Sequence, residues 1–186
     1  MSYTKVSIPK SSANAGAPIP KDPTLILVDV DDVKTEPTRS AGDVNLEGDL
    51  ELNTDAKAIG LYLTPSSIAI TEEISGEDDG KGFIKGVEGS HPGDTADIRS
   101  FVEASANKGF IALVKDCDGT SAGRWTYVGS KCNPVQLSLE TTLNNEATKR
   151  KLTFKQGMAD SFMPGLYSGA IPEIADASTS SSSESA

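Results

Sequence analysis

Short apolar runs separated by turn residues constrain the fold of this chain more than any other feature of its sequence. Nine such runs, rich in β-branched residues, are Thr24–Val30, Val44–Leu52, Ile59–Leu63, Ile68–Ile74, Phe83–Val87, Phe110–Val114, Arg124–Val128, Val135–Leu139 and Arg150–Phe154. Strands of this length at close spacing are typical of a sandwich or barrel, whereas βαβ units need a helix between successive strands. We therefore predict a mainly β fold, an antiparallel β-sandwich or barrel with a single α-helix.

Two of these runs carry further information about their place in the sheet. The run TLILVDV at Thr24–Val30 is continuously apolar up to its aspartate, which suits a strand buried on both faces. The run VNLEGDLEL at Val44–Leu52 alternates apolar and polar residues, which predicts a half-exposed strand, and Gly48 within it suggests a β-bulge.

The single helix is predicted at about 95–108, inside the segment DTADIRSFVEASANK. Its inward stripe repeats at helical spacing and consists of Ile98, Phe101, Val102 and Ser105. Asp94 is expected as the N-cap, and Gly109 is expected to take the left-handed position after the last turn. The helix would then lead directly into the strand Phe110–Val114.

Both ends of the chain differ in composition from its middle. Residues 1–23 hold four prolines among Ser, Ala, Gly and Lys, which predicts an extended arm that buries too little to fold alone. Residues 24–174 are expected to form one β-sandwich domain, and the Ser-rich residues 175–186 a disordered tail. No secretory leader or membrane span is evident, so we expect a soluble protein made in the cytoplasm.

The negative charge of the chain is concentrated in one region. The formal charge is −10, and residues 29–97 hold 17 acidic and 5 basic residues, a local balance of 5 − 17 = −12. Such a field repels phosphate and disfavours tight electrostatic binding of nucleic acid, although it serves solubility equally well. The residues that we expect on an exposed acidic face are Glu47, Asp49, Glu51, Glu72 and Glu73, and the glycine-bracketed loop Ser75–Lys81 is expected to protrude with Glu77, Asp78 and Asp79.

One motif favours catalysis at first sight. The stretch IALVKDCDGT at Ile111–Thr120 resembles the first motif of the haloacid dehalogenase phosphatases, in which the first aspartate is the nucleophile and the second the general acid and base, with Mg²⁺. That family needs a parallel sheet with crossover helices, and hairpin-like strands follow Asp118 here. We interpret the motif as a turn and expect no enzyme activity and no cofactor.

Metal sites are also weakly indicated. Asp116, Asp118 and Thr120 follow the spacing that opens a calcium loop, but the twelfth position is Tyr127 instead of glutamate and no helices flank it. We expect no metal site, and the sequence leaves open whether Asp116 and Asp118 bind one. The single histidine, His91, is expected to be a surface or packing residue.

The two cysteines do not form a disulfide framework. If Phe110–Lys115 and Arg124–Val128 pair as a hairpin, Cys117 lies near its turn and Cys132 beyond its opposite end. A strand of that length spans roughly 20 Å, beyond the Cα separation of a disulfide. We therefore expect two free thiols.

Taken in order, these elements resemble the tail tube (major tail) protein family of tailed bacteriophages. The resemblance covers residues 59–156 and rests on the helix DIRSFVEASANKG, the strands FIALVKDCDG and RWTYVGSKCNP, and the final pair VQLSLETT and TKRKLTFKQ. The Asp-x-Asp-Gly strand end, the Val-Gly turn and Asn-Pro are similar to virion proteins of phages that infect Bacteroidetes. The Ser-rich tail departs from the family pattern.

This resemblance implies a structural virion protein. Members of the family form homo-oligomeric rings, usually hexamers, which stack into a tube, contact other virion tail proteins and let DNA pass transiently through an acidic lumen. Here the arm 1–23 and the loop Ser75–Lys81 would bridge subunits, and the acidic face would line the lumen. A virion decoration or adhesin-like β-sandwich binding module remains the alternative.

Overall fold

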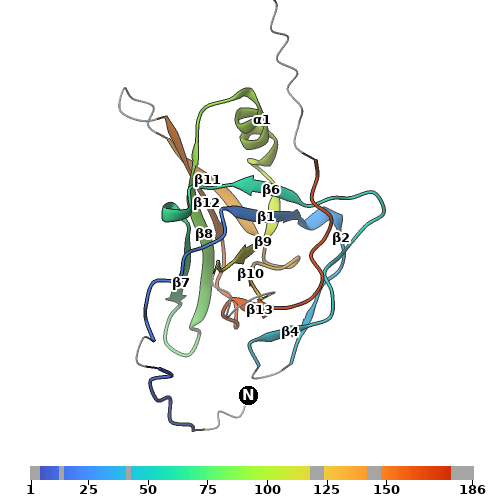
Figure 1. Cartoon of the computed structure of the whole chain (residues 1–186). Coiled ribbons are helices and arrows are strands. Elements are labelled where there is room, and N and C mark those ends of the chain that lie inside the picture. The colour runs from blue at the N-terminus through green and yellow to red at the C-terminus, as the bar shows by residue number, and fades with distance from the viewer. Residues whose placement is uncertain (1–4, 13–14, 41–42, 118–123, 142–147, 177–186) are drawn as a thin grey trace, which may run out of the picture.

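The fold is a β-sandwich-like arrangement of one large mixed sheet, one small sheet and one helix, which confirms the predicted fold class. The computed structural model in Figure 1 describes residues 5–12, 15–40, 43–117, 124–141 and 148–176. Within these ranges no closed barrel is found. All strand pairs are antiparallel except β13 with β4, which is parallel, so the sheet is mixed.

Thirteen strands are described, and eight of the nine predicted runs correspond to one strand each. The strands are β1 (Thr24–Asp29), β2 (Val33–Thr35), β3 (Thr38–Arg39), β4 (Asn45–Glu47), β5 (Glu51–Leu52), β6 (Ile59–Tyr62), β7 (Ala69–Ser75), β8 (Gly82–Pro92), β9 (Gly109–Lys115), β10 (Trp125–Val128), β11 (Val135–Glu140), β12 (Lys149–Gln156) and β13 (Gly165–Tyr167). The predicted hairpin is present as β9 and β10, which pair antiparallel.

Strand β9 is the centre of the large sheet because it pairs with three others. One of its edges pairs with β1, which also pairs with β6. Its other edge pairs with β11 near its start and with β10 near its end. Two wings therefore leave β9: the β7 wing, in the order β11-β12-β8-β7, and the β4 wing, in the order β10-β13-β4-β3. Figure 1 shows β7 and β4 on opposite sides of the molecule.

The two wings cover opposite faces of β1 and β9, and each face has its own apolar core. Leu25 and Leu27 of β1 pack into the first core, with Phe154 of the β7 wing. Ile26 and Val28 pack into the second core, together with side chains of the β4 wing and of the two-stranded β2–β5 sheet. The alternation along β1 fits a strand buried on both faces, as its continuous apolar run predicts.

Helix α1 (Ala96–Ser105) is the predicted helix, but both of its predicted capping residues are wrong. Thr95 is the N-cap, because its side chain accepts the N–H of Ile98 at 3.5 Å. Asp94 instead binds arginines, as described below. Gly109 does not take a left-handed conformation but begins strand β9, where Pro134 packs closely against its backbone. Ile98 of the predicted stripe points into the first core, which confirms the predicted inward face of the helix.

The run Val44–Leu52 is not one half-exposed strand. Gly48 has φ +90°, a left-handed conformation that ends β4, and β5 then pairs with β2 in the separate small sheet. The glycine therefore marks a change of sheet and not a bulge. Between the two strands, Leu50 is buried in the second core, and its backbone N–H donates to the Tyr167 hydroxyl at 2.9 Å. The long-range contact, which no local pattern shows, decides the conformation.

The two ends of the chain flank this domain. Residues 5–12 and 15–20 of the arm are exposed, and β1 begins at Thr24. Near the other end, Ile174 forms an isolated bridge with Ala58. Residues 177–186 of the predicted tail lie outside the described residues. Across the described parts of the chain, no helix is long and apolar enough to cross a membrane.

Candidate functional site

The acidic residues predicted on one exposed face are all exposed, but they lie in two groups at different ends of the fold. Glu47 is on β4, Asp49 follows it, and Glu51 is on β5. Glu72 and Glu73 are on β7, at the other end of the large sheet. Because side chains alternate along a strand, Glu72 and Glu73 also point to opposite faces of β7. Within a single chain, the five carboxylates do not share one face.

Three of these five carboxylates have partners within the chain. Glu51 forms an ion pair with Lys34 at 3.1 Å, and Glu73 forms one with Lys155 at the same distance. One Asp49 carboxylate oxygen accepts the backbone N–H of Ala170 at 2.8 Å, so this residue fixes a loop. For Glu47 and Glu72, no side-chain partner is found among the described residues. These two carboxylates are therefore the ones left available for a partner.

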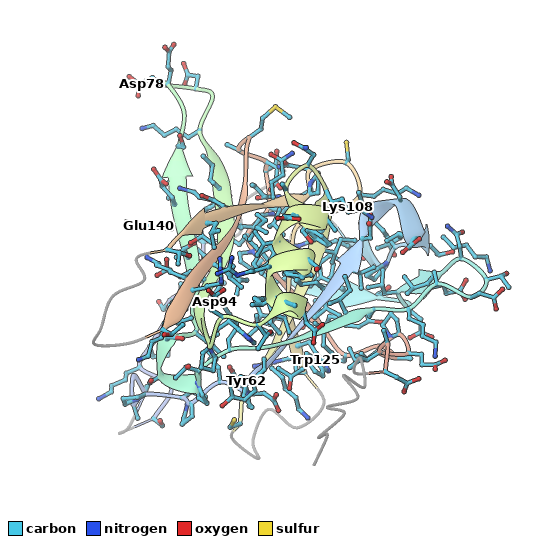
Figure 2. The ribbon with its side chains drawn as sticks, turned by 90° about the horizontal axis from the view of Figure 1, so that it is seen from above. Tyr62, Asp78, Asp94, Lys108, Trp125 and Glu140 are labelled. Carbon is cyan, nitrogen blue, oxygen red and sulfur yellow. The ribbon has the colours of Figure 1, made fainter. Side chains whose placement is uncertain are left out.

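The loop between β7 and β8 protrudes from the fold, as the sequence predicts. In Figure 2 its tip, labelled at Asp78, stands well clear of the remaining side chains. Gly76 has φ +127° and Asp79 has φ +65°, so two left-handed residues make the turn. Asp78 forms an exposed ion pair with Lys81 at 3.4 Å. The three acidic residues of this loop, Glu77, Asp78 and Asp79, are all exposed.

Strand β7 also leaves one edge of the large sheet open. It pairs with β8 along its full length of seven residues, and no other described strand pairs with it. At the opposite end of the sheet, β3 has only two residues. A long open edge presents backbone N–H and C=O groups that can pair with another chain, and proteins usually shorten or cover such edges. β6 also has a single strand partner but only four residues, so β7 is the longest edge strand of the described fold.

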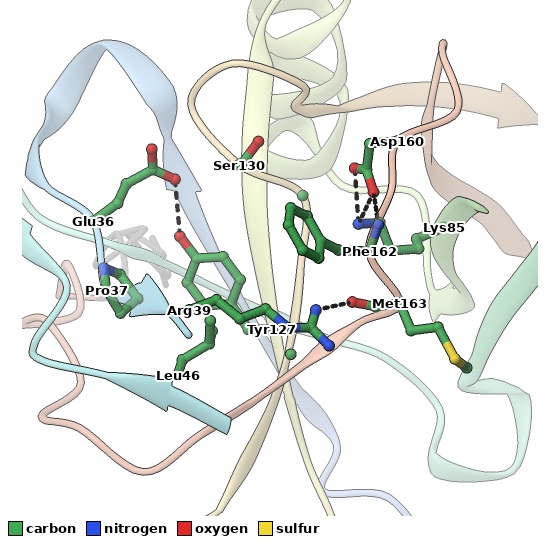
Figure 3. A pocket seen from close by; sticks show the side chains of 12 residues that line it. Glu36, Pro37, Arg39, Leu46, Lys85, Tyr127, Ser130, Asp160, Phe162 and Met163 are labelled. Carbon is green, nitrogen blue, oxygen red and sulfur yellow. Dashed lines mark hydrogen bonds and ion pairs between the residues drawn. The ribbon is translucent and has the colours of Figure 1, made fainter. Parts of the chain in front are cut away.

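A cleft of about 200 Å³ lies between the two wings (Figure 3). On one side, the Tyr127 hydroxyl donates to the Glu36 carboxylate at 3.2 Å. Burial, followed by the charge of Glu36, raises the pKa of Tyr127 above its ordinary value. On the mouth side, Arg39 donates to the carbonyl of Met163 at 2.8 Å and lies over the Phe162 ring at 5.0 Å.

The far wall of this cleft is an ion pair between the buried Lys85 and the partly buried Asp160. The Lys85 ammonium contacts both Asp160 carboxylate oxygens, at 2.8 and 2.9 Å. Burial alone would raise the pKa of Asp160, but the Lys85 bond, the Phe162 N–H and the Gln156 amide outweigh it and lower that pKa. The cleft is smaller than most small-molecule sites and its polar groups already have partners. It is better suited to a single side chain of a partner protein.

A second groove, of about 420 Å³, lies beside α1 and β6. Its floor is apolar and includes Ile59, Ile98 and Phe101, and Tyr62 on its edge is half exposed. His91 lies here on β8, and its Nδ1 is 2.8 Å from the Tyr62 carbonyl. The histidine is therefore a strand residue that holds β6 against β8, which is a packing role.

Asp94 is the residue whose role the sequence did not indicate. Its carboxylate accepts Arg99 Nε at 2.9 Å and Arg150 Nε at 3.0 Å, and it also forms ion pairs with the terminal nitrogens of both guanidinium groups. The bonds from Arg99 and then Arg150 lower the pKa of Asp94 to about 2. Arg150 is distant in sequence, so no local pattern predicts this bridge between α1 and β12.

The phosphatase-like motif lies in an antiparallel setting. Strand β9, which precedes Asp116, runs antiparallel to each of its three partners. Asp116 forms an ion pair with Lys21 of the arm, whereas Asp118 and Thr120 lie outside the described residues. In the part of the chain that is described, no three His, Cys, Asp or Glu side chains gather to hold a metal. Cys117 and Cys132 are both free, as expected, and both are exposed.

Comparisons of the chain with protein-family models, curated proteins and solved structures find no match.

Proposed function

We propose that this chain is a structural subunit that assembles with copies of itself, and that the assembly is the stacked-ring tail tube of a phage. The open β7 edge carries this proposal, because seven residues of strand end the sheet without a covering element in the described fold. Assembly supplies the missing neighbour and removes the risk of uncontrolled edge pairing. The role is structural and not catalytic.

The protruding loop and the charge of the chain support the same proposal. The β7–β8 loop stands clear of the fold, so it can reach a neighbouring subunit (Figure 2). The exposed carboxylate of Glu47 repels the phosphate backbone of DNA, which favours passage without binding. In an assembled ring, this carboxylate would contribute to an acidic lumen.

Sedimentation velocity and negative-stain microscopy of the purified full-length protein test this proposal. We expect rings or tubes of uniform bore, and the fraction of the protein found in them should increase with protein concentration. A monodisperse small species at high concentration would contradict it. Because the oligomer is held partly by edge pairing, we expect assembly to survive moderate salt better than a purely electrostatic contact would.

The cleft between the wings favours a second candidate, a virion decoration or adhesin-like binding module. Arg39 and Phe162 at its mouth pair a cation with an aromatic ring, and both types of side chain are enriched in protein interfaces. A module of this kind would remain small in sedimentation and would lose partner binding after Phe162→Ala. A tube subunit would instead keep its assembly after the same substitution.

A further inference from the structure

The open edge of β7 presents a defined set of backbone groups. The Phe83 N–H donates to the Asp160 carbonyl at 2.7 Å, and the Asp160 N–H donates to the Phe83 carbonyl at 3.0 Å. Both Phe83 groups thus point away from β7. In an antiparallel pair, opposite residues alternate between bonded and non-bonded pairs. Ile74, which faces Phe83, therefore directs its N–H and C=O to the open edge.

The same alternation extends along the strand. The Lys85 N–H also points away from β7, because it donates to the Gln156 side chain at 3.2 Å. Glu72, which faces Lys85, therefore presents its backbone groups at the edge, and Ile70 does so two residues further on. The open edge thus presents the backbone N–H and C=O groups of every second residue of β7. Beside them, the Ile74 side chain is 66% exposed, and Glu72 forms no ion pair with another residue that the structure describes.

The N-terminal arm has the complementary character. Residues 5–10, KVSIPK, are exposed at every position, and no hydrogen bond joins them to the rest of the described chain. Val6 and Ile8 are 64% and 89% exposed and lie on one side of an extended segment. Lys5 and Lys10 are its only charges, and no acidic residue precedes Asp22. A basic, alternating segment of this kind matches an acidic, open strand.

We propose that the arm of one copy pairs with β7 of a second copy as an added antiparallel strand, with Ile8 opposite Ile74 and Lys10 opposite Glu72. This inference deepens the proposed self-assembly and rests on it. The register places the most exposed aliphatic side chains of the two segments together and Lys10 beside the Glu72 carboxylate. It is strand addition, in which backbone bonds supply affinity and side chains supply the register.

Pro9 gives an independent check on this register. Proline has no N–H, so it is tolerated in an added strand only where its backbone faces solvent. With Ile8 and Lys10 bonded to the edge, the backbone of Pro9 points outward. A shift by one residue would turn Pro9 towards β7 and remove a bond. It would also move Ile8 to the opposite face of the sheet.

The second copy is the chosen partner because the arm and the edge are separate surfaces of one chain. In the structure, the chain's own residues 5–12 are exposed and pair with no strand, although its own β7 edge is open. If each copy donates its arm to the next copy, both the arm and the β7 edge of every subunit gain a pairing partner. Such a head-to-tail contact closes into a ring or continues as a filament, depending on the rotation between copies.

Charge exchange at the proposed pair tests the register. We expect Lys10→Glu and Glu72→Lys each to raise the dissociation constant of self-association about 3- to 10-fold, since a cross-strand attraction becomes a repulsion. The double variant K10E/E72K should return close to wild type. Lys149→Glu, the same charge change at an exposed residue of β12, is the matched control and should have little effect. Additive losses in the double variant, or an equal loss in K149E, would overturn the register.

Disulfide trapping tests the pairing of two chains. In a Cys117→Ser, Cys132→Ser background, a tagged Pro9→Cys chain is mixed with a Glu73→Cys chain, because these residues face each other as a non-bonded pair with Cα atoms about 4.5 Å apart. We expect a mixed dimer of distinct mass under oxidising, non-reducing conditions. Thr71→Cys, two residues out of register, is the control partner and should form much less mixed dimer with the Pro9→Cys chain.

Two outcomes separate this inference from the proposed function. Rings or tubes without a mixed P9C–E73C dimer would overturn strand addition and leave the tube proposal standing. A wild-type protein that remains monomeric would overturn both. A chain carrying both Pro9→Cys and Glu73→Cys that closes only on itself would show pairing with its own arm, which also contradicts the exchange between copies.

Discussion

Asp94 connects helix α1 to strand β12 through two arginines, and its ionisation is part of the folded state. Its carboxyl has a pKa of about 2 in the fold against an ordinary 3.8, so the folded state binds this proton more weakly than the unfolded chain. The resulting stability is present above pH 3.8 and is lost as the pH falls towards 2.

We predict that Asp94→Asn removes this part of the acid dependence. The variant should be less stable than wild type at pH 7, and the difference should shrink as both proteins are taken from pH 4 towards pH 2, because the wild-type carboxylate then becomes protonated. Thermal unfolding midpoints over this pH range measure the effect. Glu72→Gln is the control, and parallel pH curves for wild type and Asp94→Asn would refute the prediction.

Gly109 is a position where a single methyl group is too large. A Cβ there would lie 2.7 Å from Pro134 Cγ and 2.8 Å from Pro134 Cβ. We predict that Gly109→Ala lowers the free energy of unfolding by about 1–3 kcal/mol, as overpacking does elsewhere. Gly157→Ala is the matched control, because its nearest neighbour, the Gln136 amide oxygen, is 4.0 Å away. Urea titration of both variants measures the difference, and equal midpoints would exclude a packing role for Gly109.

At the scale of elements, strand β12 anchors the β7 wing to the first core through one aromatic residue. Phe154 is fully buried and meets Phe110 of β9 edge to face, with ring centroids 6.1 Å apart. We predict that Phe154→Ala lowers the free energy of unfolding by about 3–5 kcal/mol, since the cavity cannot close without moving a wing. Phe162→Ala, at a ring 40% exposed, should cost much less in the same denaturant titration. Similar losses for the two variants would contradict this account of the core.

The sequence correctly predicts those elements in which buried residues repeat at a fixed spacing within the element itself. The continuous run of β1 and the stripe of α1 depend on burial that recurs at a fixed period, so both could be found from the sequence. Strands β2, β3 and β13 have only two or three residues, too few for any period to appear. Their positions follow from pairing with distant segments, such as the parallel contact of β13 with β4.

The candidate site also combines features that local sequence predicts with features that depend on distant segments. Alternation of acidic and apolar residues correctly indicated that Glu72 and Glu73 are exposed and that the loop after β7 protrudes. Their separation from Glu47 depends on strand order, which the sequence does not reveal. Lys85 and Asp160 form an ion pair only because the segment after β12 returns to β8.

At the scale of the whole molecule, the protruding loop should affect contacts between subunits and not the fold of each subunit. We predict that the triple variant Glu77→Gln, Asp78→Asn, Asp79→Asn keeps the wild-type unfolding midpoint, because these side chains are exposed and touch no core residue. If the loop bridges rings, electron microscopy should show rings that stack into shorter tubes. Unchanged tube lengths would remove the loop from the stacking contact. Lys149→Gln serves as the control for a change in surface charge.

The central position of β9 has a consequence for synthesis of the chain. Strand β1 leaves the ribosome well before its partner in the centre of the sheet, which begins only at Gly109. At ordinary translation rates of about 5–20 residues per second, the nascent chain carries Thr24–Asp29 without that partner for several seconds. During this interval the segment is exposed to other nascent chains, so a chaperone that binds apolar strands would act before β9 emerges.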